Sequence, residues 1–260
     1  SVYEDDETVT VTIDGVSGGS ASESGSQSVT ITITENESAP TVTLTVSATS
    51  IAENAGSSLT LTATLSGASD EAVTVAIGTS GTATEGTDYT DGSGVIDDMT
   101  ISAGSTTATA NFTPTDDSIY EGSETATVSI SSVSGADSSI SGGSQSVTIT
   151  ITDNESAPTV TLAVSATSIA ENAGSSLTLT ATLSGATDST ITVALDTSGT
   201  ATEGTDYTDG SGNIDDITIS AGSTTGTVSF TPTDDSIYDA VLVRVTVGAD
   251  SLSVIVIVTD

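Results

Sequence analysis

Histidine and cysteine are absent from this chain of 260 residues, and Arg244 is its only basic residue. These absences exclude thiol chemistry, disulfides, the Ser-His-Asp triad and the usual zinc sites. With no lysine or arginine cluster to neutralise phosphates, we expect no nucleic-acid binding, and an anionic membrane surface would repel the chain. No apolar run of about 18 residues is present, so no membrane insertion is expected. No signal peptide is visible, so we expect any targeting segment to lie outside this sequence.

Aromatic residues are also scarce, at 3% of the chain, and tryptophan is absent, which argues against a sugar-binding platform. What the chain has in abundance is acid: 36 aspartate and glutamate residues give a formal net charge of −35. Such a charge keeps a protein soluble but destabilises its compact state through self-repulsion. We therefore expect high salt or bound cations to offset the repulsion, with divalent cations at clustered carboxylates as the simplest means.

The chain contains an internal repeat, because residues 39–98 and 157–216 have nearly the same sequence. Glu53 and Glu171 are equivalent, which sets the period at 171 − 53 = 118 residues. A period of this length is a whole domain, since helical and propeller repeats have units of about 20–50 residues. The function is therefore to be sought in what the repeats bind and how they are joined, more than in one deep active site.

The repeats begin out of phase with the chain, because 1–4, 118–121 and 236–239 read SVYE, SIYE and SIYD. We divide the chain into 1–35, the last two strands of a repeat; 40–157, a complete repeat; and 158–260, a modified one with a shortened final hairpin. Two interpretations of the half-repeat stay open. It belongs to a longer array, or it completes a sandwich in another molecule by strand complementation. The junctions at 35–40 and 153–158 are short, acidic and end in proline, which suggests cation-stabilised joints and an extended rod.

Short runs in which β-branched residues alternate with threonine or serine recur through both repeats, for example at 41–46, 58–65, 73–77 and 146–152. Alternation of period two, bounded by Gly, Asn, Asp and Ser, predicts half-buried strands. Seven or so strands in about 115 residues predict a β-sandwich. We expect Tyr89, Phe112 and Tyr120 to be the largest core residues of the complete repeat, and Tyr207, Phe230 and Tyr238 to be their equivalents.

Acidic residues of the complete repeat gather in four segments: 52–56 (AENAG), 86–89 (GTDY), 115–124 (TDDSIYEGSE) and 152–155 (TDNE). Four loops of a sandwich can meet at one end, and Ca²⁺ prefers six to eight oxygen ligands. At these residues the chain resembles the Calx-β domain, a module of sodium–calcium exchangers and of many bacterial surface proteins. The resemblance covers both larger repeats and the half-repeat. It implies all-β, tandem immunoglobulin-like sandwiches that bind calcium at one end, arranged as an extended rod outside the cell or on its surface.

Carried over residue by residue, the resemblance implies metal ligands in all three segments. In the complete repeat these are the side chains of Glu53, Asp88, Asp116, Asp117, Glu121, Glu124 and Asp153, the backbone carbonyl of Ile119 and, as a weaker candidate, Glu155. In the last repeat they are Glu171, Asp206, Asp234, Asp235, Ile237, Asp239 and Asp260. In the half-repeat Glu4, Glu7 and Glu35 remain.

The last repeat departs from the pattern, because Asp239 is shorter than Glu121 and the position of Glu124 falls in the apolar run 241–243. We expect it to bind fewer or weaker ions. The alternative for every repeat is that these acids are solvated loop residues. Asp91, Asp97 and Asp98, with Asp209, Asp215 and Asp216, form a separate set that we interpret as exposed hairpin residues.

The final strands of the last repeat are more apolar than their counterparts. The run 147–151 (VTITI) becomes Val254, Ile255, Val256 and Ile257, followed by Val258, and the preceding strand 241–247 is also more apolar. A strand that is apolar on both faces is buried on both faces or is prone to aggregate. We therefore expect 241–258 to form an interface, with a neighbouring repeat or a second chain, and 1–35 to take part as well. The alternative is a terminal cap whose sequence has drifted.

Three functions remain after these exclusions. The first is a calcium-binding structural repeat protein that forms a rigid extracellular stalk, sheath or filament. The second is a calcium-dependent adhesive module that binds a glycan or a cell-surface receptor. The third is a regulatory calcium sensor, which needs an effector domain that the sequence does not show. An enzyme is not expected, because the paired carboxylates lie in duplicated repeats without an aromatic subsite.

Overall fold

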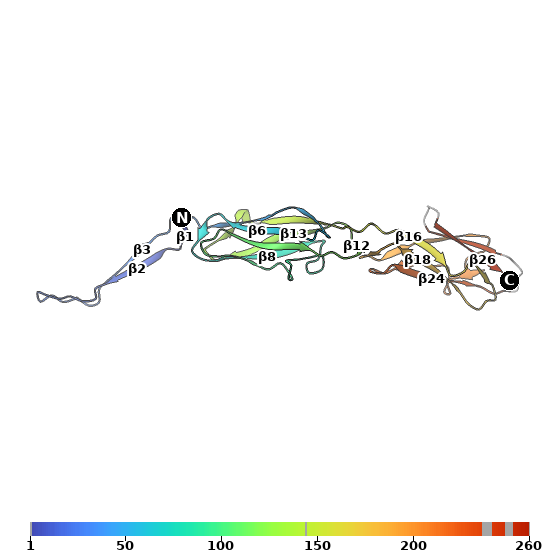
Figure 1. Ribbon diagram of the computed structural model, residues 1–260. Helices are drawn as coiled ribbons and strands as arrows, with labels where there is room; N and C mark the ends of the chain where they lie inside the picture. The colour runs from blue at the N-terminus through green and yellow to red at the C-terminus, as the bar shows by residue number, and fades with distance from the viewer. Residues whose placement is uncertain (1, 144, 236–240, 248–251, 260) are drawn as a thin grey trace. The chain divides into compact units, whose positions relative to one another are not determined.

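The computed structural model describes residues 2–143, 145–235, 241–247 and 252–259. The chain forms two compact units (Figure 1). The first consists of 1–116 with 123–152, and the second of 117–122 with 153–260. Almost every regular element in the described residues is a strand, as the alternating sequence predicts, and the exception is a single 3-10 turn, η1 (Ser141–Gly143). No helix in this part of the chain has the length and hydropathy needed to cross a membrane.

The first unit contains a sandwich of two five-stranded sheets. In spatial order, one sheet consists of β10 (Met99–Ile101), β8 (Val73–Gly81), β13 (Glu124–Ser134), β15 (Ser146–Thr152) and β5 (Ser50–Ala52). The other consists of β14 (Ser139–Ile140), β4 (Thr41–Val46), β6 (Leu59–Leu65), β11 (Thr107–Pro114) and β9 (Tyr89–Thr90). The runs predicted at 41–46, 58–65, 73–77 and 146–152 are therefore confirmed as β4, β6, β8 and β15.

The core of this sandwich is built by the alternation itself. Along β6 the burial alternates, so that Leu59, Leu61, Ala63 and Leu65 point inward. Similar inward rows from β13 and β15 face them and complete one hydrophobic core. Within this core the rings of Tyr89 and Phe112 stack with centroids 4.6 Å apart and an interplanar angle of 20°. An offset stack of this kind adds to the burial of both rings.

The second unit contains the equivalent sandwich. One sheet has the order β16 (Val160–Val164), β18 (Leu177–Leu183), β24 (Thr225–Pro232) and β22 (Tyr207–Thr208). The other has the order β17 (Ser168–Ala170), β26 (Leu252–Thr259), β25 (Val241–Val247) and β21 (Leu195–Gly199), and β20 (Ile191–Val193) pairs separately with β23 (Ile217–Ile219). The rings of Tyr207 and Phe230 stack at 4.8 Å and 18°, as their equivalents do in the first sandwich.

The prediction that Tyr120 is a core residue was wrong. Tyr120 is half-buried and belongs to neither core. It lies in β12 (Ile119–Tyr120), which pairs in parallel with β19 (Ala186–Thr187). The equivalent segment β1 (Val2–Tyr3) pairs in the same way with β7 (Ala68–Ser69). Tyr120 therefore lies in a strand beside β19 and outside both cores, whereas the equivalent Tyr3 packs against the first core. Tyr238 lies outside the described residues.

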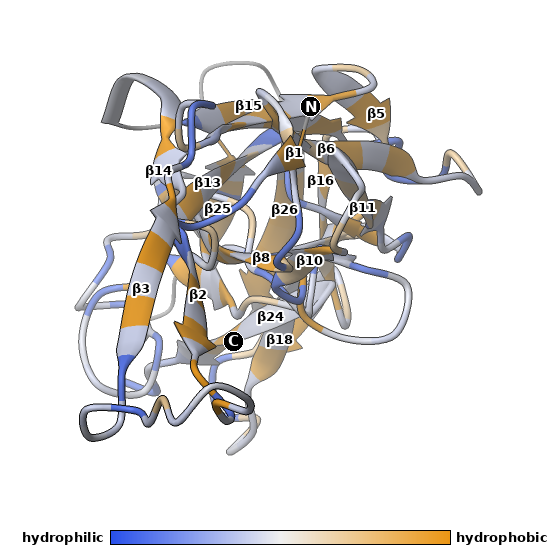
Figure 2. Ribbon diagram, turned by 90° about the vertical axis from the view of Figure 1, so that its left-hand side faces the viewer, coloured by the Kyte–Doolittle hydropathy of each residue, from blue (hydrophilic) through white to orange (hydrophobic). Residues whose placement is uncertain are grey.

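Residues 1–35 contribute a two-stranded hairpin beyond β1. Strands β2 (Glu7–Thr12) and β3 (Ser28–Ile33) pair in antiparallel register, with Val9 opposite Ile31 and Val11 opposite Val29. Directly opposed residues share a face, so one face of the hairpin is apolar and the other carries threonines. Figure 2 shows hydrophobic residues alternating with polar ones along β3. The fold class is thus confirmed as all-β with tandem immunoglobulin-like sandwiches, while the domain limits at 35, 40, 157 and 158 stay a prediction.

Candidate metal centre

Glu53, Asp153 and Glu155 form the first group of carboxylates at one end of the complete repeat. One carboxylate oxygen of each lies within 4.8 Å of the others. Glu53 follows β5, and its amide donates a 2.9 Å hydrogen bond to the carbonyl of Thr152 at the end of β15. This bond extends the pairing of β5 with β15 and holds Glu53 beside Asp153. Glu53 is 5% exposed, which is unusual for a glutamate because burying a charge without a counter-charge is costly.

Asp153 also organises the backbone of the neighbouring loop. Its Oδ2 accepts hydrogen bonds from the amides of Glu121 at 2.7 Å and Gly122 at 2.6 Å, and its Oδ1 accepts one from Glu155 at 2.7 Å. Burial of the Asp153 carboxyl opposes its ionisation, but the bonds from Glu155, Glu121 and Gly122 outweigh burial, so its pKa lies below the ordinary value. The group is therefore ionised at neutral pH, as a metal ligand must be.

Asp88, Glu121 and Glu124 form the second group, again with one carboxylate oxygen of each within 4.8 Å of the others. Asp88 is placed by the turn that precedes β9: its amide donates to the carbonyl of Thr84, and its Oδ2 accepts from the Thr84 amide. Gly86, with φ +86°, makes this turn possible, because glycine adopts a positive φ without the steric cost of a Cβ. Glu121 and Glu124 come from one loop and the start of β13, and all three residues are half-buried.

Not every predicted ligand of the complete repeat belongs to one of these two groups. Asp116 and Asp117 are exposed, and Oδ1 of Asp117 accepts a 2.7 Å hydrogen bond from the amide of Ile119. Ile119 itself lies in β12 and pairs with Ala186. Six predicted side chains are thus assembled into two groups of three, and the roles predicted for Asp116, Asp117 and Ile119 stay predictions.

The last repeat is only partly described at this end, because Ile237, Asp239 and Asp260 lie outside the described residues. Oε1 of Glu171 accepts a 3.2 Å hydrogen bond from the amide of Asp235. Oδ2 of Asp206 accepts one of 2.6 Å from the Thr202 amide, as Asp88 does from Thr84. Asp234 is exposed beside a small depression that Glu171 also lines. Within the described part of this repeat, no three carboxylates meet as they do in the first.

In the half-repeat, the loop equivalent to the one that carries Glu121 keeps the same backbone hydrogen bond. Glu35 is equivalent to Asp153, and its Oε2 accepts a 2.6 Å hydrogen bond from the amide of Glu4, the equivalent of Glu121. The side-chain hydrogen bond that Glu35 shares with Glu37, followed by the bonds from the amides of Glu37 and Glu4, lowers the pKa of Glu35 to about 2. Glu7 is exposed at the start of β2. Among the described residues, Glu4, Glu7 and Glu35 are not gathered into a group of three.

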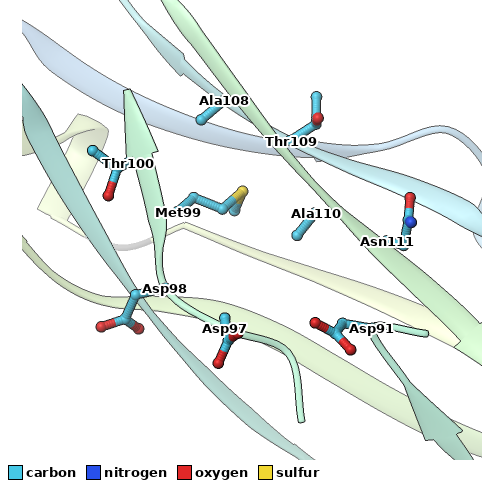
Figure 3. Close-up of a pocket in the computed structure, with 9 residues that line it drawn as sticks. All are labelled: Asp91, Asp97, Asp98, Met99, Thr100, Ala108, Thr109, Ala110 and Asn111. Carbon is cyan, nitrogen blue, oxygen red and sulfur yellow. The ribbon is translucent and has the colours of Figure 1, made fainter. Parts of the chain in front are cut away.

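The acids that we set apart as hairpin residues have structural partners. Figure 3 shows Asp91, Asp97 and Asp98 along an open depression of about 500 Å³ in the first sandwich. Asp91 accepts hydrogen bonds from the amides of Ser93 and Gly94, and Asp98 accepts one from the amide of Ile77. These three are not among the carboxylates that converge in the described chain.

Glu85 is a structural residue that the sequence reasoning did not single out. Its Oε1 accepts from the amide of Ile96 and its Oε2 from the hydroxyl of Thr79, and Glu203 repeats both bonds with Ile214 and Thr197. The sequence signal for this role was a glutamate that stands three residues before the aspartate of the GTDY segment in both repeats.

The donor set of the two groups suits calcium. Three carboxylates offer up to six oxygens, the lower end of the coordination number of Ca²⁺, and water or carbonyls complete the shell. Neither imidazole nor thiolate is available anywhere in the chain, which disfavours zinc and the softer transition metals. Residues 35–155 contain no lysine or arginine, so the charge of the groups can be neutralised only by ions from solution.

A family model, the Calx-beta domain, matches residues 35–155 and again residues 153–245. The chain belongs to the Calx-beta domain family. Both groups of carboxylates lie within the first Calx-beta match, and Glu171, Asp206, Asp234 and Asp235 lie within the second. The resemblance inferred from the four acidic motifs is confirmed.

Several solved structures are similar to this Calx-beta chain. CBD12 from CALX1.2 shares 19% identity over 78% of this chain and 79% of its own, with a TM-score of 0.35. Invasin, a bacterial integrin-binding protein, shares 18% over 98% of this chain and 45% of its own, with a TM-score of 0.31. Domains 1–6 of the surface layer protein SbsC share 13% over 98% and 45%, with a TM-score of 0.30. No curated protein matches the chain by sequence.

Proposed function

We propose that this protein is a calcium-binding structural protein whose Calx-beta repeats build a stalk, sheath or filament outside the cell. The observation that carries the proposal is the convergence of six carboxylates into two groups of three in a repeat without a basic residue. The proposal assigns the acidic loops a structural role and no catalytic one.

Electrostatics explains why such groups need a cation. Two carboxylates 4.8 Å apart repel each other by roughly 3 kcal/mol at an effective dielectric constant of about 20. Each group of three contains three such pairs, and Glu53 is almost fully removed from solvent. A Ca²⁺ ion bound by all three carboxylates offsets this repulsion, because it attracts each of them. Since the ion binds only the folded arrangement, it stabilises the repeat by mass action.

The structural role is supported by the sameness of the repeats. Two units with the same aromatic stack and with nearly the same sequence over 39–98 and 157–216 favour a spacer built of like units over a set of distinct recognition sites. A location outside the cell is part of the same proposal. It requires an affinity like that of extracellular calcium modules, whose dissociation constants are about 10⁻⁴–10⁻³ M.

Calorimetric titration and thermal unfolding of the whole chain test the calcium-binding part. We expect saturable calcium binding and a higher melting temperature in calcium than in chelator. Small-angle scattering and electron microscopy of the same samples test the structural part, because a stalk or filament requires particles that become stiffer or longer when calcium is added. Absence of both calcium binding and a thermal shift would contradict the proposal and leave the acids as solvated loop residues.

A further inference from the structure

The N-terminal hairpin presents an apolar face to solvent. We call this the hairpin face, and it consists of Val9 and Val11 of β2 with Val29, Ile31 and Ile33 of β3. These five side chains are between 48% and 58% exposed. A shallow depression of about 300 Å³ lies at one end of the hairpin, lined partly by Val11, Ile13 and Val29. A contiguous apolar face of this kind marks an interaction site more often than a solvated surface.

The repeat supplies an internal comparison for this face. The equivalents of Val9, Val11, Ile31 and Ile33 are Ala126, Val128, Ile149 and Ile151, all of which are buried in the first core. The same pattern is thus covered by a facing sheet in the first sandwich, whereas no sheet within the described residues covers it in the hairpin. Both sandwiches already have their own last two strands, β13 with β15 and β25 with β26, so no acceptor in the described chain lacks them.

A second apolar face lies on the outside of the last two strands. We call this the terminal face, and it consists of Leu242 and Arg244 of β25 with Ile255 and Ile257 of β26, which are opposed in register. The three apolar residues are between 41% and 45% exposed, and Arg244 is exposed as well. On the other side of the same strands Val243, Val245, Val256 and Val258 fill the core, so the hairpin is apolar on both faces.

The same comparison shows that the terminal face is specific to the last repeat. Its four residues stand where the first sandwich has Thr125, Thr127, Thr148 and Thr150 on its outer face. The equivalence follows from the backbone: Thr82 bonds to the carbonyl of Thr125 as Thr200 bonds to that of Leu242, and Ile51 opposes Ile151 as Ile169 opposes Val258. Four threonines are thus replaced by three aliphatic residues and the only cation of the protein.

The two faces are complementary in charge as well as in hydrophobicity. The segment 1–35 has no basic residue and contains the acids Glu4, Asp5, Asp6, Glu7, Asp14, Glu23 and Glu35. Glu7 opposes Ile33 and therefore lies on the hairpin face. Arg244 lies on the terminal face, and among the described residues it has no ion-pair partner. Because Arg244 is the only basic residue, any other contact between charged side chains of two copies would bring acid against acid.

We propose that the hairpin face of one copy packs against the terminal face of a second copy. The contact joins two different patches, so it is heterologous and repeats from copy to copy in a head-to-tail series. Symmetric pairing of like faces is disfavoured, because it brings Arg244 against Arg244 or Glu7 against Glu7. The inference deepens the proposed structural function and rests on it for its biological meaning. The aliphatic residues that form the contact take no part in the carboxylate groups.

Sedimentation velocity over a range of concentrations tests the contact, with the whole chain in about 0.15 M salt with calcium. We expect Val9→Thr/Ile31→Thr and Ile255→Thr/Ile257→Thr each to abolish the concentration-dependent association of the wild type. Val95→Thr is the matched control, because Val95 is 56% exposed and lies on neither face. Threonine already occupies the outer positions of the first sandwich, so the Ile255/Ile257 variant is expected to keep its fold, which circular dichroism checks.

Mixing the two double variants separates a heterologous contact from a symmetric one. Each variant retains one intact face, so an equimolar mixture is expected to form a dimer and nothing larger. Association of either variant alone, or none in the mixture, would overturn the proposal. A further result against it is assembly that survives Ile255→Thr/Ile257→Thr but not Val9→Thr/Ile31→Thr, because that pattern indicates strand insertion rather than packing of faces.

The charge of Arg244 gives an independent readout. Arg244→Glu is expected to weaken association more than Arg244→Gln at low salt, and the difference is expected to shrink at about 0.5 M salt as screening increases. Equal effects of the two substitutions at low salt would contradict the role of charge. If the wild type shows the calcium-dependent rise in melting temperature but never associates, the contact fails while the calcium-binding function stands.

Discussion

Oδ2 of Asp153 accepts a 2.7 Å hydrogen bond from the backbone amide of Glu121, which ties the end of β15 to the acidic loop before β13. The same relationship recurs in the N-terminal half-repeat, where Glu35 accepts from Glu4 at 2.6 Å. The aspartate therefore has two tasks, since it is a candidate ligand and also fixes the loop that carries another one. The loop is shaped by the backbone itself, before any ion is considered.

Replacing Glu53 tests the first group of carboxylates. We expect Glu53→Gln to lower calcium affinity, because a charged oxygen ligand is lost from a group of three. At calcium concentrations about 100 times the dissociation constant, a lost site removes about 2.7 kcal/mol of stabilisation, or roughly 5–10 °C in melting temperature. Thermal unfolding with calcium and with chelator, beside calorimetric titration, measures both quantities.

The matched control for this variant is Asp97→Asn, which removes one carboxylate that lies outside both groups. In chelator we expect Glu53→Gln to be at least as stable as the wild type, because a negative charge next to Asp153 and Glu155 is gone. An equal thermal shift in Asp97→Asn and Glu53→Gln would show that calcium acts on the overall charge and not at a site.

The second group allows the two repeats to be compared. We expect Glu124→Gln to reduce the number of bound ions measured by calorimetry, since Glu124 is one of three converging ligands. Asp206→Asn, at the position in the last repeat that matches Asp88, is expected to have a smaller effect. The loss of the Glu124 position to apolar residues is the reason for this difference. A larger effect in the last repeat would contradict the ranking of the two sites.

Gly81 is a conformational requirement of the fold. The amides of Thr82 and Ala83 both bond to the carbonyl of Thr125, and Gly81 reaches this bulge with φ +136°. A Cβ at Gly81 would overlap the Thr125 carbonyl oxygen. We expect Gly81→Ala to destabilise the first sandwich by about 1–3 kcal/mol, measured by denaturant unfolding. Gly67→Ala is the control, because its Cβ meets nothing within 4 Å and is expected to change little.

The stacked aromatic pairs are expected to carry much of the stability of each sandwich. Phe112→Ala removes a fully buried ring from its stack on Tyr89 and should cost about 3–5 kcal/mol. Phe230→Ala should cost a similar amount in the second sandwich. Because the two lie in separate cores, each variant should shift only one of two unfolding transitions in calorimetry. A shift of both transitions by one substitution would show that the sandwiches unfold as a single unit.

The regular parts of the molecule could be predicted from sequence because they depend on local pattern. Alternation located the strands, the period of 118 residues located the repeats, and four motifs pointed to the six carboxylates that converge. The family match confirms the resemblance on which that selection was based. The turn at Gly86 could also be predicted, because glycine is the residue that most readily adopts the positive φ observed there.

The features that could not be predicted from the sequence depend on contacts between segments that are far apart in the chain. Tyr120 was predicted to be a core residue, yet it lies in β12, which pairs with β19, and is only half-buried. Asp117 is predicted as a ligand by its motif, but its carboxylate accepts a hydrogen bond from the amide of Ile119 and is in neither group of three, so its role stays a prediction. Asp153 also accepts backbone hydrogen bonds and does belong to a group, so only coordinates show which carboxylates converge.

The hairpin carboxylates Asp91 and Asp209 lead to a prediction about how the stability of the fold depends on pH. Hydrogen bonds from the Ser93 amide and hydroxyl, and from the Gly94 amide, hold the pKa of Asp91 below its ordinary value, and Ser211 and Gly212 act in the same way on Asp209. A carboxyl whose pKa is lowered by folding stabilises the folded state above its unfolded pKa of about 3.9, and this contribution is lost as the pH falls through the folded value.

We therefore expect Asp91→Asn to be less stable than the wild type at neutral pH and to differ less from it as the pH falls below about 4. Acid unfolding in chelator, followed by circular dichroism, measures the difference without interference from bound calcium. NMR titration of Asp91 itself provides a direct check, with a midpoint below that of an exposed aspartate. A midpoint at or above the ordinary value would show that the turn of 91–94 does not hold the ionised carboxylate in solution.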